Sequence, residues 1–151
     1  MNDVISPLHF LRGVGLVAAT VVVQAIAQIV LTQVLEILPS LRGRRHLDQF
    51  GVLYITVAVL ILTLGMVGEI IVWALLYYTW GELGSFANSV YFSLASFTTV
   101  GASELVLSPT HRLAGALEAG VGMLMFGWST ALLFEVIQTT RGTRRSATGR
   151  A

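Results

Sequence analysis

The sequence contains no cysteine and no lysine, and only 11% of its 151 residues are charged. Without cysteine the chain has no disulfide framework and no thiolate metal site. Its three histidines, His9, His46 and His111, stand far apart at the ends of sequence segments. They give no grounds for a shared metal site, so the chemistry of the chain has to come from other residues.

What the chain has in place of charge is apolar surface. Hydrophobic residues make up 55% of it, and the mean hydropathy is +0.79. A single soluble core of this size cannot bury so much apolar surface, so the composition predicts a membrane protein. The first apolar run is longer than a signal-peptide core, and no small-residue cleavage site follows it, so no cleavable signal is expected.

Three apolar runs, at residues 13–38, 50–80 and 111–138, exceed the roughly 20 residues that a helix needs to cross a bilayer. A fourth segment, 86–97, is too short to span. The prediction is an all-α membrane protein with three transmembrane helices and a short re-entrant helix between the second and third.

All nine basic residues are arginines, and seven of them form two clusters that flank these runs. The first cluster follows the first run, and the second follows the last: Arg42, Arg44 and Arg45; Arg141, Arg144, Arg145 and Arg150. By the positive-inside rule both are cytoplasmic, which places the N-terminus on the extracytoplasmic side of an inner or plasma membrane. The chain divides into a tail, first helix and Arg-rich turn (1–46), a central unit (47–140) and a basic cytoplasmic tail (141–151).

Polar residues recur along the first run at four-residue spacing. They are Thr20, Gln24, Gln28 and Thr32, and Gln33 and Glu36 extend the stripe. Such a stripe favours hydrogen bonds to a neighbouring helix, because lipid offers no partners. An interfacial helix or a water-facing role is the alternative.

The second run carries four aromatic residues towards its far end, Trp73, Tyr77, Tyr78 and Trp80, as an interfacial aromatic belt would. Gly65 and Gly68 predict a close helix contact. Glu69 is an intramembrane acid, which marks a functional position by default. The alternative is a protonated or hydrogen-bonded carboxyl buried against a neighbouring subunit or the short helix. After this run, Glu82 is expected to be solvated in an exposed turn.

Residues 91–104 read Tyr-Phe-Ser-Leu-Ala-Ser-Phe-Thr-Thr-Val-Gly-Ala-Ser-Glu. A short helix here runs into a polar, irregular segment at membrane depth. Such backbone is tolerated only where it is enclosed by protein or lines a water-filled path. The C-terminal end of a helix carries partial negative charge, so a helix that ends there favours a cation in the path.

This order of parts, with Thr-Val-Gly after the short helix, resembles the pore domain of potassium-type channels, whose filter reads Thr-Val-Gly-Tyr-Gly. The resemblance covers roughly residues 60–138. It implies a homotetramer whose filter consists of Thr98, Thr99, Val100, Gly101, Ala102 and Ser103. It also implies that Thr99, Val100 and Gly101 bind the permeating cation, K⁺ and/or Na⁺, with no other cofactor. Valine would supply a packed outer face, and glycine a backbone that accepts positive φ.

Ala102 and Ser103 stand where that family has tyrosine and glycine. The bracing ring is lost, and a left-handed serine costs on the order of 1 kcal/mol. We therefore expect a wider or hydrated outer half of the filter and weak discrimination between potassium and sodium. Glu104 stands where the family has aspartate, and four copies would concentrate cations, including divalents, at the outer mouth. A solvated surface carboxylate is the alternative.

Ala95 stands where some family members place a buried acid behind the filter. Glu118 is expected to replace that acid by bonding Ser93, Ser96 or a filter amide, and a titratable gating role is the alternative.

Gly122 matches the family's inner-helix hinge, although close helix packing explains a glycine there equally well. Phe126, Thr130 and Phe134 recur at four-residue spacing. They would face the axis as a cavity wall and a hydrophobic gate, or serve only in helix packing.

The leading hypothesis is a tetrameric cation channel in lipid, weakly selective for monovalent cations. It would not be an enzyme, and the sequence shows no partner among nucleic acids or soluble proteins. The alternatives are a non-conducting or scaffolding protein that retains the fold, and a channel for divalent cations. Gly127-Trp128-Ser129-Thr130 superficially fits a hydrolase serine, but no intramembrane histidine can act as its base. Without interrupted helices in two repeated halves, a transporter is disfavoured.

Overall fold

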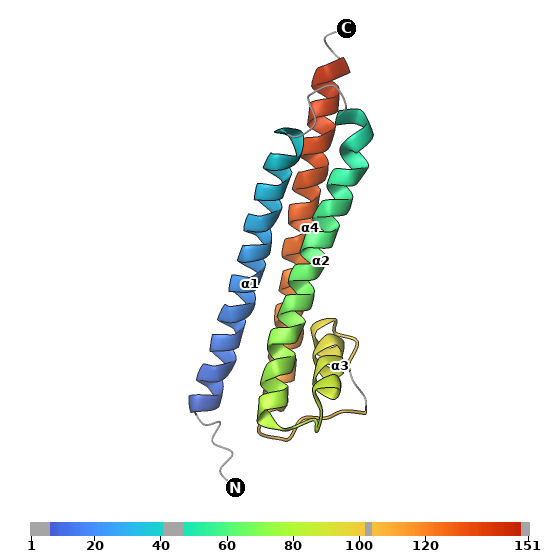
Figure 1. Ribbon diagram of the computed structural model, residues 1–151. Coiled ribbons are helices and arrows are strands. Elements are labelled where there is room, and N and C mark those ends of the chain that lie inside the picture. Colours follow the sequence, from blue (N-terminus) through green and yellow to red (C-terminus); the bar gives the residue numbers. More distant parts are fainter. Residues whose placement is uncertain (1–6, 41–46, 102–103, 149–151) are drawn as a thin grey trace.

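The computed structural model describes residues 7–40, 47–101 and 104–148. They form four α-helices: α1 Pro7–Ser40, α2 Leu47–Trp80, α3 Phe86–Phe97 and α4 Arg112–Thr148. The three long helices lie side by side, and the short α3 lies beside the end of α2 (Figure 1). The prediction of an all-helical chain with a short helix at 86–97 is confirmed.

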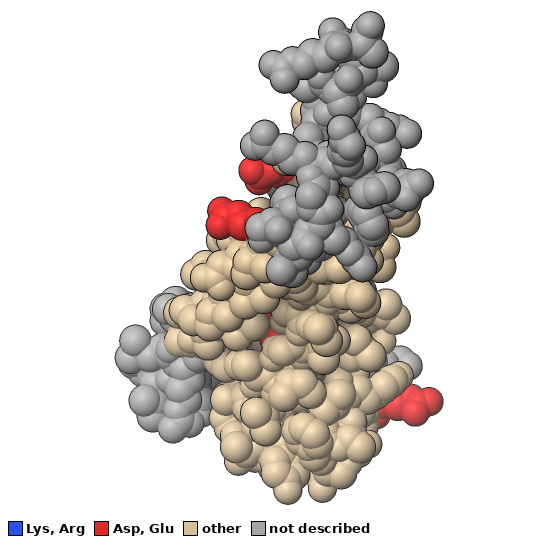
Figure 2. All heavy atoms as spheres, turned by 45° about the horizontal axis from the view of Figure 1, so that its top comes forward, with Lys and Arg blue, Asp and Glu red and all other residues tan. Residues whose placement is uncertain are grey.

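Among the described residues, three segments are long and apolar enough to cross a membrane: Gly15–Ile37, Gly51–Trp80 and Arg112–Thr139. The protein is therefore a multi-pass membrane protein. Figure 2 shows a broad uncharged surface on which few acidic atoms are visible. Large apolar side chains are exposed on each long helix, including Val22 (56%), Leu64 (69%) and Leu124 (68%). In this setting such surface faces lipid or another protein.

The last helix is longer than predicted. It continues through most of the expected basic tail to Thr148. No proline follows Pro109 in the sequence, so the chain contains no residue that would force the helix to stop at 138. The end of α1, the start of α2 and the end of α4 lie at one end of the bundle, whereas α3 and the start of α1 lie at the other (Figure 1). This arrangement agrees with the predicted topology, whose orientation in a membrane stays a prediction.

Helices α1 and α2 approach closely at the two predicted glycines. A Cβ atom at Gly65 would lie 2.8 Å from the Cβ of Ala27, and one at Gly68 would lie 3.5 Å from Val23 Cγ1. Small residues let helix backbones pack closely where lipid gives no hydrophobic drive for association. The predicted close contact is confirmed, and α1 is its partner.

The polar stripe of α1 divides into two halves. Thr20 and Gln24 are fully buried, and they bond side chains of α2 and α4 respectively: Trp73 Nε1 donates to Thr20 Oγ1 (3.0 Å), and Gln24 Nε2 donates to Ser129 Oγ (2.9 Å). Thr32 is exposed, and its hydroxyl donates to carbonyls of its own helix. The prediction of hydrogen bonds between helices is therefore confirmed for the first two residues of the stripe, whereas Thr32 bonds within its own helix.

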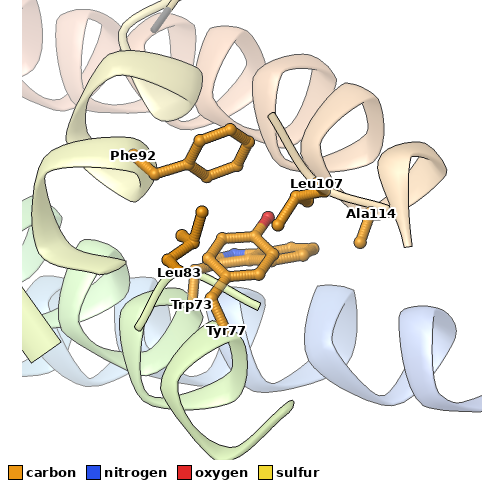
Figure 3. Packing of buried hydrophobic residues seen from close by; sticks show 6 residues of the cluster. All are labelled: Trp73, Tyr77, Leu83, Phe92, Leu107 and Ala114. Carbon is orange, nitrogen blue, oxygen red and sulfur yellow. The ribbon is translucent and has the colours of Figure 1, made fainter. Parts of the chain in front are cut away.

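The predicted aromatic belt is wrong for two of its four members. Trp73 and Tyr77 are fully buried, whereas Tyr78 is 52% exposed. The buried pair belongs to a core cluster with Leu83, Phe92, Leu107 and Ala114 (Figure 3). Tyr77 packs edge-to-face against Phe92 at a centroid distance of 5.1 Å. The pair points inward because α3 and the loop before α4 cover this end of α2.

We predict that Gly65→Ala lowers the thermal unfolding midpoint of the purified protein, because the new methyl group forces α1 and α2 apart. Gly15→Ala is the matched control: Gly15 is also helical, and a Cβ there has nothing within 4 Å. The control should be neutral or stabilising, by up to about 1 kcal/mol. Adding Ala27→Gly to Gly65→Ala should recover most of the loss. A double variant no more stable than Gly65→Ala would contradict the contact.

Candidate ion pathway and the acids behind it

A capped start fixes α3 close to the end of α2. Ser85 is the N-cap: its backbone is extended, and its Oγ accepts from Asn88 N at 3.1 Å. Asn88 Nδ2 in turn donates to the carbonyl of Leu83 at 2.9 Å. Serine is a preferred N-cap because its side chain satisfies a free amide of the first turn. The entry to the short helix is thus determined by residues of the 81–85 turn.

The two faces of α3 differ. Its buried residues are Ser89, Phe92, Ser93, Ala95, Ser96 and Phe97. On the opposite face Tyr91 and Leu94 are 53% and 47% exposed. The helix therefore packs one face against the other helices of the chain and leaves an apolar face exposed.

The chain reverses direction at the end of α3. Thr98 N and Thr98 Oγ1 both donate to the carbonyl of Leu94, at 3.1 and 2.7 Å. Thr99 and Gly101 have positive φ, 62° and 81°, and Gly101 N donates to the carbonyl of Ala95 at 2.9 Å. Glycine takes this conformation freely, whereas threonine takes it at a cost on the order of 1 kcal/mol. The positive φ at Gly101 matches the prediction, and that at Thr99 was not anticipated.

The predicted filter residues 99–101 form an exposed edge of the chain. Thr99, Val100 and Gly101 are exposed, and Val100 is 81% exposed, so within one chain it lacks the packed environment predicted for it. Glu104 is also exposed. Ala102 and Ser103 lie outside the described residues.

Glu118 lies directly behind α3 and is fully buried. Its Oε2 accepts from the Tyr77 hydroxyl at 2.7 Å, and its Oε1 lies 2.5 Å from Ser93 Oγ. The geometry matches the predicted contact with Ser93. The contact with Tyr77 was missed because an aromatic residue near a helix end suggested an interfacial belt. One carboxyl group thus connects three helices.

The hydrogen bonds around Glu118 are best satisfied when this acid is neutral. Ser93 Oγ also lies 2.8 Å from the carbonyl oxygen of Ile70, and a serine hydroxyl has one hydrogen to donate. If Ser93 donates to Ile70, the proton between Ser93 and Glu118 must belong to the carboxyl. A neutral acid also avoids the large cost of a buried charge. In that state Tyr77, Glu118, Ser93 and the Ile70 carbonyl form one donor-to-acceptor network.

Gly122 allows α4 to touch the end of α3. A Cβ atom added at Gly122 would collide with the carbonyl oxygen of Phe97. Of the two explanations for this glycine, the structure provides a reason for close packing. A hinge role stays a prediction.

Phe126, Thr130 and Phe134 lie on a face of α4 that the rest of the described chain leaves exposed. Phe126 and Phe134 are 40% and 61% exposed, and Thr130 is exposed with its hydroxyl donating to the Phe126 carbonyl at 2.8 Å. The Phe126 ring lies beside the buried Phe97 ring, with centroids 5.9 Å apart. The open face of α4 therefore begins next to the end of α3.

The prediction of a solvated Glu82 is wrong. Its Oε2 accepts from Ser108 N, and its Oε1 accepts from Ser108 Oγ, both at 2.7 Å. His111 Nδ1 lies 2.6 Å from Oε1, and the His111 ring stacks on Trp80 with centroids 4.1 Å apart. Glu82 thereby attaches the loop before α4 to the end of α2, a contact between residues too far apart in sequence for spacing to reveal.

Two opposing effects act on the pKa of Glu82. Burial acts to raise it, whereas hydrogen bonds from Ser108 and His111, together with the charge of His111, lower it and prevail. The pKa therefore lies below its ordinary value of 4.5. A carboxyl with a lowered pKa stabilises the fold above its ordinary pKa, and this stabilisation is lost as pH falls below it.

Replacing Glu82 should make the unfolding midpoint depend less on pH at acidic pH. We expect the wild-type unfolding midpoint to fall as pH decreases below about 4.5, in line with the linkage relation. Glu82→Gln should be less stable than wild type at pH 7 and should lose less between pH 7 and that range. Glu104→Gln, which changes an exposed carboxyl, is the control and should follow the wild-type curve. Parallel wild-type and Glu82→Gln curves would contradict the assignment.

Two variants of Glu118 should show whether the neutral or the ionised carboxyl group stabilises the fold. Glu118→Gln resembles the neutral acid and should lower stability only slightly. Glu118→Ala removes the partner that the Tyr77 and Ser93 hydroxyls share in a dry core. Each buried group left unsatisfied lowers the free energy of unfolding by about 1–3 kcal/mol, and the cavity lowers it further. Thermal unfolding in detergent measures both variants. A Gln variant as unstable as the Ala variant would show that the ionised form is the one that stabilises the fold.

A family model described as "Ion channel" matches residues 56–139, more than half of the chain. The match runs from α2 through α3 to α4, and it leaves α1 outside. No curated protein and no solved structure matched the chain. The chain has three apolar spans and a short helix that ends in an exposed reversal, and the family model matches more than half of it. The chain therefore belongs to this ion channel family.

Proposed function

We propose that four copies of this chain surround a common axis and form a channel for monovalent cations with weak selectivity. The observation that carries the proposal is the exposed reversal at residues 98–101. This backbone, with two positive φ angles, projects from the subunit and is anchored to α3 by the bond from Gly101 N to Ala95 O. Polar backbone of this kind fits a membrane protein where it lines a water-filled path.

The end of α3 favours a cation beside this segment. The C-terminal end of a helix carries roughly half a negative charge, and four such ends around one axis would add up. Carbonyl oxygens of Thr99, Val100 and Gly101 would replace water around the ion, as filter carbonyls do in channels. Each subunit supplies a quarter of the site. The cargo is K⁺ and/or Na⁺, and the function requires no other cofactor.

Open apolar faces support the assembly. Tyr91 and Leu94 on α3 and Phe126 on α4 are between 40% and 53% exposed, and Val100 is 81% exposed. In a tetramer, neighbouring subunits would cover part of this surface and provide the packing that Val100 lacks within one chain. Phe126, Thr130 and Phe134 would line the cavity, where a ring of phenylalanines closes a pore by excluding water.

The weak selectivity follows from the residues after Gly101. Alanine and serine at 102 and 103 cannot brace the filter as tyrosine and glycine would, so fewer sites strip the ion of water. Glu104 is exposed, and four copies would attract cations to the mouth. The same two residues favour the second candidate, a non-conducting scaffold that keeps the architecture.

Cation flux into liposomes that contain the purified protein tests this function. We expect potassium and sodium to enter at rates within about tenfold of each other, equivalent to about 1.4 kcal/mol, and a large organic cation to be excluded. Gly101→Asp should abolish flux, because it places a side chain and a charge at a positive φ in the filter. Gly81→Asp is the matched control: Gly81 also has positive φ (70°) with nothing within 4 Å of an added Cβ, and it lies outside the filter.

Light scattering on the same preparation reports the assembly. Four copies of the 16.3 kDa chain are expected in each particle. A tetramer that passes no ion under any gradient or pH would favour the scaffold. Flux that Gly101→Asp and Gly81→Asp leave equally intact would reject the assigned pathway.

A further inference from the structure

The bundle contains a group of buried oxygens that have no hydrogen-bond partner. Both carboxyl oxygens of Glu69 and the amide oxygen Oε1 of Gln24 belong to it, and both side chains are fully buried. The great majority of buried polar groups in proteins are paired, so each exception needs a physical explanation. These two residues come from different helices, and neither belongs to the filter.

Contacts on either side of Glu69 place it opposite Gln24. Gly65 precedes Glu69 by one turn, and a Cβ there would lie 3.8 Å from Gln24 Oε1. Trp73 follows Glu69 by one turn and donates to Thr20, which is one turn before Gln24 on α1. Residues four apart share a helix face. Glu69 is therefore enclosed between two contacts with α1, and it faces the segment from Thr20 to Gln24.

Gln24 also connects this position to the last helix. Its Nε2 donates to Ser129 Oγ on α4 at 2.9 Å, which leaves Oε1 as the open end of the amide. Of the two ends of the Gln24 side chain, the donor is engaged and the acceptor is available. An acceptor can be satisfied only by a group that carries a hydrogen.

Arg112, the first residue of its segment, is the only basic residue in the sequence of the three spanning segments 15–37, 51–80 and 112–139 and of α3. The other ionisable side chains described on the packed helices are Glu36 on α1, Tyr54, Tyr77 and Tyr78 on α2, Tyr91 on α3, and Arg112, Glu118 and Glu135 on α4. Of these, Tyr77 and Glu118 bond each other. An ionised Glu69 would thus be an isolated buried charge, which costs tens of kcal/mol in a low-dielectric medium before relaxation.

We propose that Glu69 is a proton-binding site inside the subunit, with its carboxyl hydrogen directed to Gln24 Oε1, either directly or through one water. The proton satisfies two unpartnered groups together, because it gives Glu69 a donor and Gln24 Oε1 something to accept. Through its Nε2 group, Gln24 also donates a hydrogen bond to Ser129 on α4. This assignment goes beyond ion conduction, and it does not depend on whether the pore conducts.

The amide makes the arrangement a relay with two states. If Glu69 loses its proton, the carboxylate is a pure acceptor, and its high cost falls only when the Nε2 donor of Gln24 turns towards it. The amide then turns over, and its oxygen faces Ser129, whose hydroxyl changes from acceptor to donor. Helix α1, which lies outside the family match, thereby couples the protonation of an acid on α2 to a hydrogen bond on α4.

Infrared spectroscopy of the full chain in lipid tests the proton site. The Glu118→Gln background removes the other buried carboxyl. In that background at pH 7 we expect the carbonyl band of a protonated carboxylic acid, and adding Glu69→Gln should remove it. Exchanging potassium for sodium should leave the band unchanged. Absence of the band, or a band that appears only when alkali ions are removed, would overturn the proposal, the second result indicating an alkali-cation site.

A second variant tests the relay. Gln24→Met keeps the length of the side chain but offers no amide oxygen, so the Glu69 carbonyl band should move to the higher frequency of a less strongly bonded acid. Thr20→Val, one turn away, breaks the bond to Trp73 and is the matched control, which should leave the band in place. An unchanged band in Gln24→Met, or an equal shift in both variants, would overturn the role of Gln24.

Discussion

The carboxyl group of Glu118 is the contact on which the position of α3 depends. A helix of twelve residues cannot span a bilayer, and it has no covalent connection to the helices behind it except its two loops. Glu118 holds it by accepting from Tyr77 of α2 and by pairing with Ser93 of α3. Because lipid offers no competing partner, these bonds have no replacement if the helix moves outward.

The same reasoning explains why the reversal after α3 keeps its shape. Its backbone is tied to α3 through Gly101 N, and α3 is tied to α4 both by Glu118 and by the close approach at Gly122. At the other end of α3, Glu82 attaches the loop before α4 to the end of α2. An exposed segment with an unusual threonine conformation is thus supported from behind at several points, as a segment that positions carbonyl oxygens would need to be.

The sequence predicted local features well and long-range partners poorly. The length of segment 86–97 and its place between two long apolar runs were enough to predict α3 with the bounds that the structure gives, because both are properties of neighbouring residues. The approach at Gly65 was predictable from two small residues in an apolar run, and the contact between Glu118 and Ser93 was implied by the resemblance to potassium-type channels. The buried position of Trp73 and Tyr77 was not, since it depends on α3 folding back over α2. The partners of Glu82 escaped prediction because they lie 26 and 29 positions away along the chain.

The two halves of the bundle are stabilised differently. Eight of the described residues are polar or charged and buried, and all of them lie between the α3 end of the bundle and the level of Ser129. Beyond Ser129 the interior cluster is apolar: Leu31, Ala58, Leu62, Leu132 and Val136. Packing alone gives weak preference for one arrangement in a membrane, because lipid is as apolar as the helix surface. The half that carries Phe134 is therefore held by apolar packing, whereas hydrogen bonds between helices support the half that carries residues 98–101. Ser129 lies at this boundary, where its bond to Gln24 connects α4 to α1.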